Sequence, residues 1–168
     1  MSKPPYRKNL FTEVPEKRVR PQNNPKEVAV RMVEGVEMSF MYATRESGYH
    51  SGPHYHDAEQ INYIVEGEFW FFVEDQGYRC VKGDVMRIPR NKLHWAWNRG
   101  DVPCVLIEAH SPPLTGDQKL RDAAIPLTGP EEDTANIPRA RNIHITDPRT
   151  KDVEEKAINE EAERNRGF

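Results

Sequence analysis

The chain has 168 residues, a formal net charge of -3 and only 36% hydrophobic residues, a length that suits one compact domain with tails. Outside a short N-terminal arm it carries no basic field large enough to attract nucleic acid, and it has no run of roughly 18 apolar residues that would span a membrane. The N-terminal segment also lacks the apolar core of a secretory signal. We therefore expect a cytoplasmic protein that binds neither nucleic acid nor a membrane.

Residues 1–26 are predicted to form an extended N-terminal arm. The first 25 residues contain five prolines and six Lys or Arg, and proline interrupts both helices and strand ladders. Such an arm either lies across its own domain or a partner subunit, or it is a disordered terminus.

Residues 27–112 carry the pattern of an all-β domain. Short runs rich in β-branched and aromatic residues are separated by turn residues, and no helical period competes with them. This spacing predicts eight or nine short strands in a barrel or sandwich. The expected strands are 28–33, 36–44, 53–56, 59–65, 69–74, 78–81, 85–89, 92–98 and 102–109.

Two cysteines, Cys80 and Cys104, fall inside expected strands. Without a secretory signal, two buried reduced thiols are the favoured state. A disulfide between them is the alternative, because the cysteine count is even.

Residues 113–168 are predicted to be a C-terminal extension. A loop-rich stretch from Ser111 to Thr150 contains six prolines, and a helix is expected at about 151–165. Val153, Ala157, Ile158 and Ala162 give this helix a narrow apolar stripe, while its other positions are mostly charged. The stripe is able to dock on the barrel or on another subunit, and the charged face suits solvent.

Three of the six histidines form a pattern typical of a metal site. His54 and His56 alternate on one strand and so face the same side, Gln60 keeps their parity, and His94 lies on a later strand. Neutral imidazole is the commonest protein ligand of Zn, Mn, Fe and Ni ions. The alternative is that the histidines satisfy one another through hydrogen bonds and water. A His-x-His pair with a third histidine on a nearby strand favours metal.

The same residues resemble the two motifs of the cupin superfamily. The first motif corresponds to Gly48, His54-Tyr55-His56, Gln60 and Gly67, and the second to Gly83, Pro89-Arg90-Asn91, His94 and Asn98, with every spacing matched. The resemblance implies a single-domain cupin: a double-stranded β-helix, or jelly-roll, barrel holding one divalent metal ion through His54, His56, Gln60 and His94. It also implies a homodimer, with the N-terminal arm as the candidate exchanged segment.

The sequence departs from these motifs at two positions. Asn91 replaces a glycine, which the turn tolerates because asparagine adopts the left-handed conformation readily. Gln60 replaces the usual glutamate, and strand alternation points the neighbouring Glu59 to the opposite face. If Gln60 is a ligand, all four ligands are neutral and the ion is a stronger Lewis acid that favours an anionic substrate. Alternatively, Gln60 only orders a bound water.

Glu108, near the end of the last expected strand, is the candidate general base if it faces the cavity. Its alternative role is an exterior salt bridge. Tyr42, Trp70, Phe72 and Arg87 are candidate cavity-lining residues, and Arg87 either binds an anionic substrate or lies on the surface.

The remaining histidines and two tryptophans are not expected at the metal. His110 is expected in a loop just outside its strand, and His50 and His144 match no ligand position. Trp95 and Trp97 have the opposite parity to His94 and should face away from the metal.

Three functions suit the expected site. The first is an enzyme that acts on a small oxygen-rich, anionic molecule by non-redox isomerase- or lyase-type chemistry. The second is a dioxygenase that uses Fe(II), or a similar ion, and O2. The third is a barrel that binds a small molecule without converting it. The fold alone does not choose among them.

Overall fold

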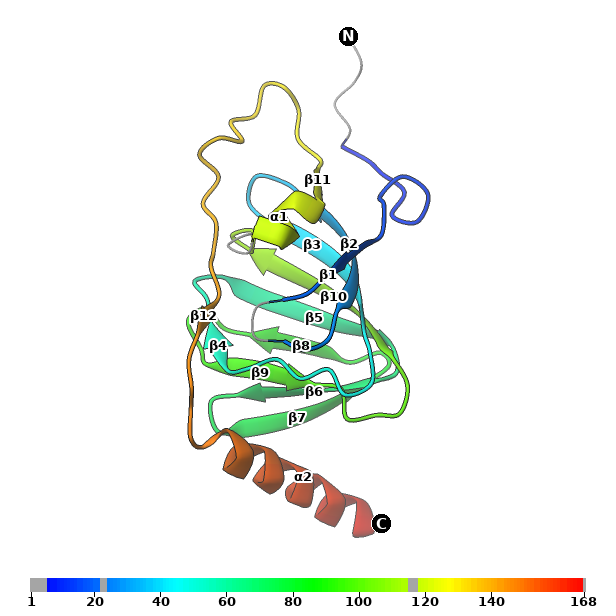
Figure 1. The fold of residues 1–168 in the computed structure, drawn as a ribbon, viewed down its shortest axis with the longest axis vertical. Coiled ribbons are helices and arrows are strands. Elements are labelled where there is room, and N and C mark those ends of the chain that lie inside the picture. The colour runs from blue at the N-terminus through cyan, green and yellow to red at the C-terminus, as the bar shows by residue number, and fades with distance from the viewer. Residues whose placement is uncertain (1–5, 22–23, 115–117, 168) are drawn as a thin grey trace.

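The computed structural model describes residues 6–21, 24–114 and 118–167. Two mainly antiparallel sheets form a jelly-roll barrel in this part of the chain (Figure 1). The strands are β1 (Lys17–Val19), β2 (Val28–Glu34), β3 (Ser39–Arg45), β4 (His54–Tyr55), β5 (Glu59–Glu66), β6 (Glu68–Val73), β7 (Gln76–Val81), β8 (Val85–Ile88), β9 (His94–Trp97), β10 (Cys104–Ser111), β11 (Ala124–Pro126) and β12 (Ile143–His144). The helices are α1 (Gln118–Ala123) and α2 (Thr150–Arg166).

The larger sheet has the strand order β1-β2-β3-β10-β5-β8, with β11 beside β2, and the smaller has the order β12-β4-β9-β6-β7. Strict alternation of burial in β3 and β10 turns every second side chain into the barrel. The resulting core is apolar over most of the barrel and contains Val28, Val30, Met32, Met41, Ala43, Ile64, Phe69, Phe71, Ile88 and Leu106. The inward positions of β10 change from Cys104 and Leu106 to Glu108 and His110, so one end of the interior is polar.

The turns between strands use the left-handed backbone conformation at the motif positions. Gly48, Gly67 and Gly83 have φ angles of 76°, 83° and 96°. At Gly67 an added Cβ would lie 2.9 Å from the Pro103 carbonyl oxygen, so a side chain there would be strained as well as crowded. Asn91 has a φ of 60°, which confirms that asparagine takes the turn position of the motif glycine.

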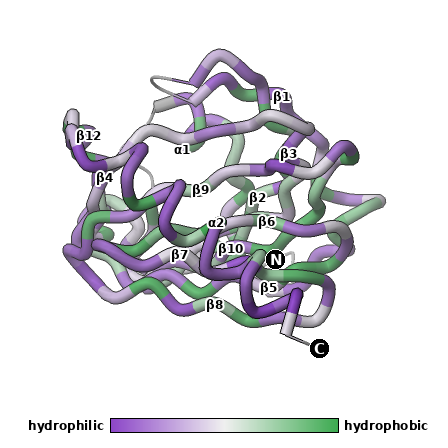
Figure 2. The backbone as a smooth tube through the Cα atoms, turned by 90° about the horizontal axis from the view of Figure 1, so that it is seen from below, coloured by the Kyte–Doolittle hydropathy of each residue, from purple (hydrophilic) through white to green (hydrophobic). Residues whose placement is uncertain are grey.

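Helix α2 covers the outer face of the smaller sheet. Its Val153 and Ala157 are buried against Trp70, Phe72 and Trp95. The three aromatic rings are stacked in series, with centroids 5.9 and 5.2 Å apart. Seen from below in Figure 2, α2 crosses in front of the barrel strands. The expected helix is therefore confirmed, and its apolar stripe docks on the barrel of the same chain.

Both terminal segments pack on the barrel. Strand β1 of the arm pairs with β2 of its own chain, while residues 1–5 and 22–23 of the expected arm lie outside the described residues. The C-terminal extension contains α1, β11 and β12, although the sequence suggested only loops there. Residues 115–117 and 168 of this extension also lie outside the described part. From β12 the chain runs down one side of the barrel to α2 (Figure 1).

Cys80 and Cys104 are buried free thiols. Burial raises the pKa of Cys80 to about 11 and that of Cys104 to about 12. Of the helices in the described ranges, none is long and apolar enough to cross a membrane.

Candidate metal centre

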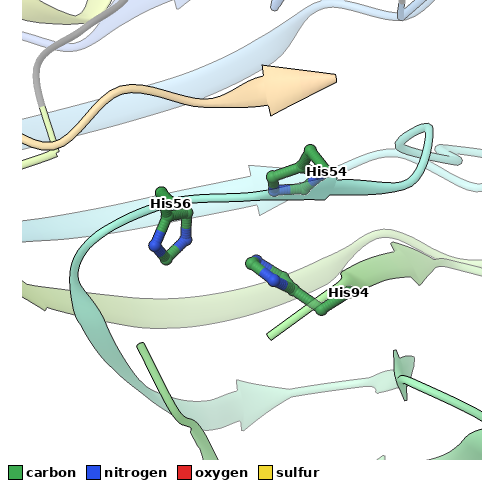
Figure 3. Close-up of side chains that lie close together, drawn as sticks. All are labelled: His54, His56 and His94. Atoms are coloured by element: carbon green, nitrogen blue, oxygen red, sulfur yellow. The ribbon is translucent and has the colours of Figure 1, made fainter. Parts of the chain in front are cut away.

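Three histidines meet inside the polar end of the barrel. His54 lies on β4, His56 follows it directly, and His94 begins β9, where it pairs in register with His54. One ligand atom of each histidine lies within 4.8 Å of the other two. Figure 3 shows the rings of His54 and His56 on one segment and that of His94 on the facing strand, all directed into one gap. The sequence placed these residues together correctly, and the group is able to hold a metal ion.

Backbone hydrogen bonds fix which nitrogen of each ring is available. The Nδ1 atoms of His54, His56 and His94 lie 2.8, 3.0 and 2.8 Å from the carbonyl oxygens of Gly52, Ala58 and Lys92. A carbonyl oxygen only accepts, so each Nδ1 carries the proton and each Nε2 presents its lone pair. Metal-bound histidines are commonly oriented by such a bond from their other nitrogen.

The local environment keeps these rings neutral. Burial lowers the pKa of His54 to about 4, and it lowers the pKa of His56 and of His94 as well. The Nε2 atom of His94 is buried and has no hydrogen-bond partner among the described residues. An unpaired buried lone pair that faces two others is what a bound cation would satisfy.

Gln60 places an amide oxygen beside the three histidine rings. It is buried on β5, and its Oε1 lies 3.2 Å from His56 Nε2. Its Nε2 donates to Asn62 Oδ1 at 2.7 Å, which fixes the orientation of the amide. His56 Nε2 and Gln60 Oε1 are therefore two acceptors that face each other. Their separation is close to the distance of roughly 3.4 Å between two ligand atoms of a tetrahedral zinc ion. Glu59 points outward, as strand alternation predicted, and pairs with Arg87.

A cavity of about 120 Å³ is lined by His54, His94 and Gln60. Apolar core side chains, including Phe69, Phe71 and Ile88, form part of its wall. In addition to these candidate ligands, its polar lining includes Arg45, Glu108, His110, Asn142 and His144.

Glu108 faces this cavity and is also ion-paired. It is 8% exposed, and its Oε1 accepts a hydrogen bond of 2.7 Å from Nη2 of the buried Arg45. The two roles suggested by the sequence, a cavity carboxylate and a salt bridge, thus combine in one residue, although the salt bridge is interior rather than exterior. His110 corrects a prediction, because it lies within β10 and not in a loop. Its ring points inward, 5.5 Å from that of His56, and burial lowers its pKa well below the usual value.

None of the four expected pocket residues lines the cavity. Trp70 and Phe72 lie on the outer face of β6 under α2, whereas Phe69 and Phe71 of the same strand point into the barrel. The prediction was wrong because β6 is apolar on both faces, so its sequence does not reveal which face is inside. Tyr42 packs edge-on against Phe11 of the arm at 5.2 Å. Arg87 is exposed and bound to Glu59.

Other site residues were missed by sequence reasoning. Arg45 shares the inward parity of Met41 and Ala43 on β3, a signal that could have located it. His144 reaches the cavity from β12, which pairs with β4, and its ring lies 5.3 Å from that of His54. No local pattern in the sequence predicts this pairing.

The other aromatic side chains follow the prediction. The Trp95 ring faces away from the metal site into the cluster under α2, and its indole Nε1 donates to Glu154 at 2.8 Å. His50 also contacts Glu154, with its Nε2 2.6 Å from Oε1, and takes no part in the metal group.

Comparison with known proteins agrees with this arrangement. Residues 41–110 match the family model described as the cupin domain. The barrel therefore contains a cupin domain. A search among curated proteins found no match for the sequence.

Similar solved structures include two cupin barrels with little sequence identity to this one. A predicted oxalate decarboxylase from Thermotoga maritima is 19% identical, with 60% of this chain and 95% of that chain covered at a TM-score of 0.55. The polyketide cyclase RemF from Streptomyces resistomycificus is 16% identical, with 62% and 78% covered, also at 0.55. At such identities the likeness shows the fold and not the reaction.

Proposed function

We propose that this cupin is a metal-dependent enzyme that acts on a small, oxygen-rich, anionic molecule by non-redox chemistry of the isomerase or lyase type. The observation that carries the proposal is the neutral donor set. His54, His56 and His94 offer Nε2 lone pairs, and Gln60 offers an amide oxygen beside them.

A donor set without a carboxylate does not offset the charge of the ion. A divalent ion held by His54, His56, Gln60 and His94 would polarise a carbonyl or enolate oxygen of the substrate. Because the four donors are neutral, an anionic substrate is favoured, since it supplies the missing negative charge. The donors suit zinc, manganese, iron or nickel.

Glu108 is the proposed general base. It extends from β10 into the same cavity, and only its Oε1 has a hydrogen-bond partner within the described ranges. Arg45 holds that oxygen, which leaves Oε2 to take a proton from the substrate and return it. Exchange of a proton between two carbon positions is an isomerase step, and removal of a proton next to a leaving group is a lyase step.

The first test is elemental analysis of the protein purified without added metal, followed by oxygen-electrode and product assays with hydroxy- and keto-acids. Zinc, manganese or nickel with substrate turnover and no O2 uptake supports the proposal. Iron near one atom per chain with substrate-dependent O2 uptake would favour a dioxygenase instead. A ligand bound and recovered unchanged would indicate a binding protein, and absence of metal under all loading conditions would overturn the metal site.

We also propose that the protein is a homodimer. The outer face of the larger sheet exposes Ile61 and Tyr63 on β5 and Val85 on β8, with exposed fractions of 45%, 40% and 65%. The ion pair of Glu59 and Arg87 borders this face and offers both charges to a symmetry-related copy. A twofold axis brings identical patches together, so an apolar patch with both charges at its edge suits a second copy of this chain.

A cytoplasmic location is proposed on the two buried free thiols, since reduced cysteines are typical of that compartment. Cell fractionation with an antibody against the protein tests this, and recovery outside the cytoplasmic fraction would contradict it.

A further inference from the structure

Arg45 is a buried cation whose hydrogen bonds are incomplete. It ends β3, is only 5% exposed and borders the cavity. Nη2 donates to Glu108 and the guanidinium lies 5.0 Å above the Tyr49 ring, which together hold it in place. Its Nε and Nη1 atoms are buried without an acceptor in the described part of the chain. Buried guanidinium donors are normally paired, and carboxylate is their preferred partner.

The position of Arg45 relative to the metal site sets the length of a ligand that reaches both. His110 lies beside His56 at the metal end of β10. Glu108, which accepts the hydrogen bond from Arg45, is the next inward residue on that strand. Successive inward residues of a strand are about 7 Å apart. With carbon–carbon bonds of about 1.5 Å, a dicarboxylate whose outer oxygens are separated by one such step has about four carbons.

The size and charge of the cavity agree with such a ligand. A cavity of about 150 Å³ holds benzene, so the cavity of about 120 Å³ admits only a ligand of comparably few atoms and is too small for a sugar phosphate. Arg45 and Glu108 cancel each other in charge, and the metal donors are neutral, so a bound divalent ion leaves two positive charges for the ligand to match.

We propose that the cavity binds a small dicarboxylate of about four carbons, with one carboxylate at the metal site and the other on the unpaired donors of Arg45. The metal end of this inference rests on the proposed function, whereas the Arg45 end does not.

The test is isothermal titration of succinate and of butyrate, which has the same number of carbons but one carboxylate, into metal-loaded and metal-free protein. Succinate is expected to bind the loaded protein at least about tenfold more tightly, the effect of one charge-assisted hydrogen bond. The metal-free protein should keep a weaker preference for succinate.

Three variants assign the effect to Arg45. The double variant Arg45→Gln, Glu108→Gln removes both buried charges together and should abolish the preference for succinate. Glu108→Gln alone should tighten succinate binding several-fold, because a negative charge that competes for Arg45 is gone. Arg87→Gln removes an arginine that does not line the cavity and should leave the preference for succinate unchanged.

Equal affinities for succinate and butyrate would overturn the inference, as would a preference that survives in the double variant. If thermal unfolding shows that the double variant does not fold, the test of Arg45 rests on Glu108→Gln. Unchanged or weaker succinate binding by that variant would then reject the role of Arg45. Failure to bind any metal, with Arg45-dependent succinate binding retained, would reject the proposed metal function and leave the anion site standing.

Discussion

At the scale of single residues, His94 is the ligand whose removal should be most informative. Its Nε2 is buried, and its ring lies between those of His54 and His56, at 4.3 and 4.7 Å. His94→Ala should strip the metal and leave a folded barrel, because the apolar core does not include this residue. Elemental analysis measures the metal content of the variant, and circular dichroism shows whether it is folded. His50→Ala, which removes an imidazole outside the metal group, should keep its metal. Full occupancy in His94→Ala would reject the ligand set.

Gln60→Glu tests the argument from charge. A carboxylate beside His56 adds one negative charge to the donor set, so divalent metal should bind more tightly, by about tenfold or more. Anionic ligands should bind more weakly, because the ion keeps less of its charge. Competition with a chelator measures the first effect and succinate titration the second. Gln76→Glu adds the same charge at the exposed first residue of β7 and should affect neither. Unaltered metal affinity in Gln60→Glu would show that this side chain is not a ligand.

The buried histidines predict how the stability of the metal-free protein depends on pH. Burial lowers the folded-state pKa of His54 to about 4 and also lowers those of His56, His94 and His110. The unfolded chain has histidine pKa values near 6.5, so it binds more protons at acid pH. Stability is therefore complete above about pH 6.5 and is lost as the pH falls towards 4, by about 1.4 kcal/mol per pH unit for each proton taken up on unfolding.

Urea denaturation of the metal-free protein at several pH values between 8 and 4 measures this slope. His54→Asn removes one of the titrating groups, so its stability should fall less steeply over that range. Identical slopes for the two proteins would contradict the lowered pKa of His54.

At the scale of elements, α2 is held by a buried carboxylate as well as by apolar packing. Glu154 accepts from Trp95 at 2.8 Å and lies 2.6 Å from His50, and Ala157 packs where Gly77 leaves room for it. Glu154→Ala leaves the indole N–H unpaired and should lower the free energy of unfolding by about 1–3 kcal/mol. The tryptophan emission should shift to the red as the helix loosens, because α2 covers Trp70 and Trp95. Exposed Glu155→Ala is the matched control, and equal stability of the two variants would contradict the role of Glu154.

How well the sequence predicted each element depended on whether one face or two are buried. Strand β5, which carries Gln60, was placed correctly because its inward and outward residues alternate. His54 and His94 lie on short strands without clear alternation, and the spacing of the two motifs located them. In β6 both faces are buried, one by the core and one by α2, so Trp70 and Phe72 were assigned to the wrong side.

Contacts between segments far apart in the sequence could not be predicted from local sequence patterns. His144 enters the site because β12 pairs with β4, and nothing in the short segment around Ile143 predicts that pairing. Arg45 was within reach of the alternation argument, since it continues the inward series of β3, but its meaning depends on its contact with Glu108 on β10. The metal ligands follow from motif spacing, whereas the remainder of the cavity lining requires the fold.

At the scale of the whole molecule, the exposed apolar face of the larger sheet predicts self-association. Val85 of β8 lies opposite Tyr63 of β5, and Ile61 is the next outward residue on β5, so the three side chains form one patch. Association should bury this patch, and each buried aliphatic side chain contributes about 1.5–3 kcal/mol. Sedimentation equilibrium of the native protein should therefore give twice the monomer mass of 19.5 kDa.

The double variant Ile61→Lys, Val85→Lys places two positive charges in that patch and should yield a monomer that retains its metal, because both side chains point away from the cavity. Val102→Lys alters a side chain of similar exposure, 59%, in the loop before β10 and should leave the dimer intact. A native protein that sediments as a monomer, or a double variant that stays dimeric, would contradict the assignment of this face. Because the metal ligands and the cavity residues named here belong to a single chain, the monomeric variant should still bind succinate, which separates assembly from ligand binding.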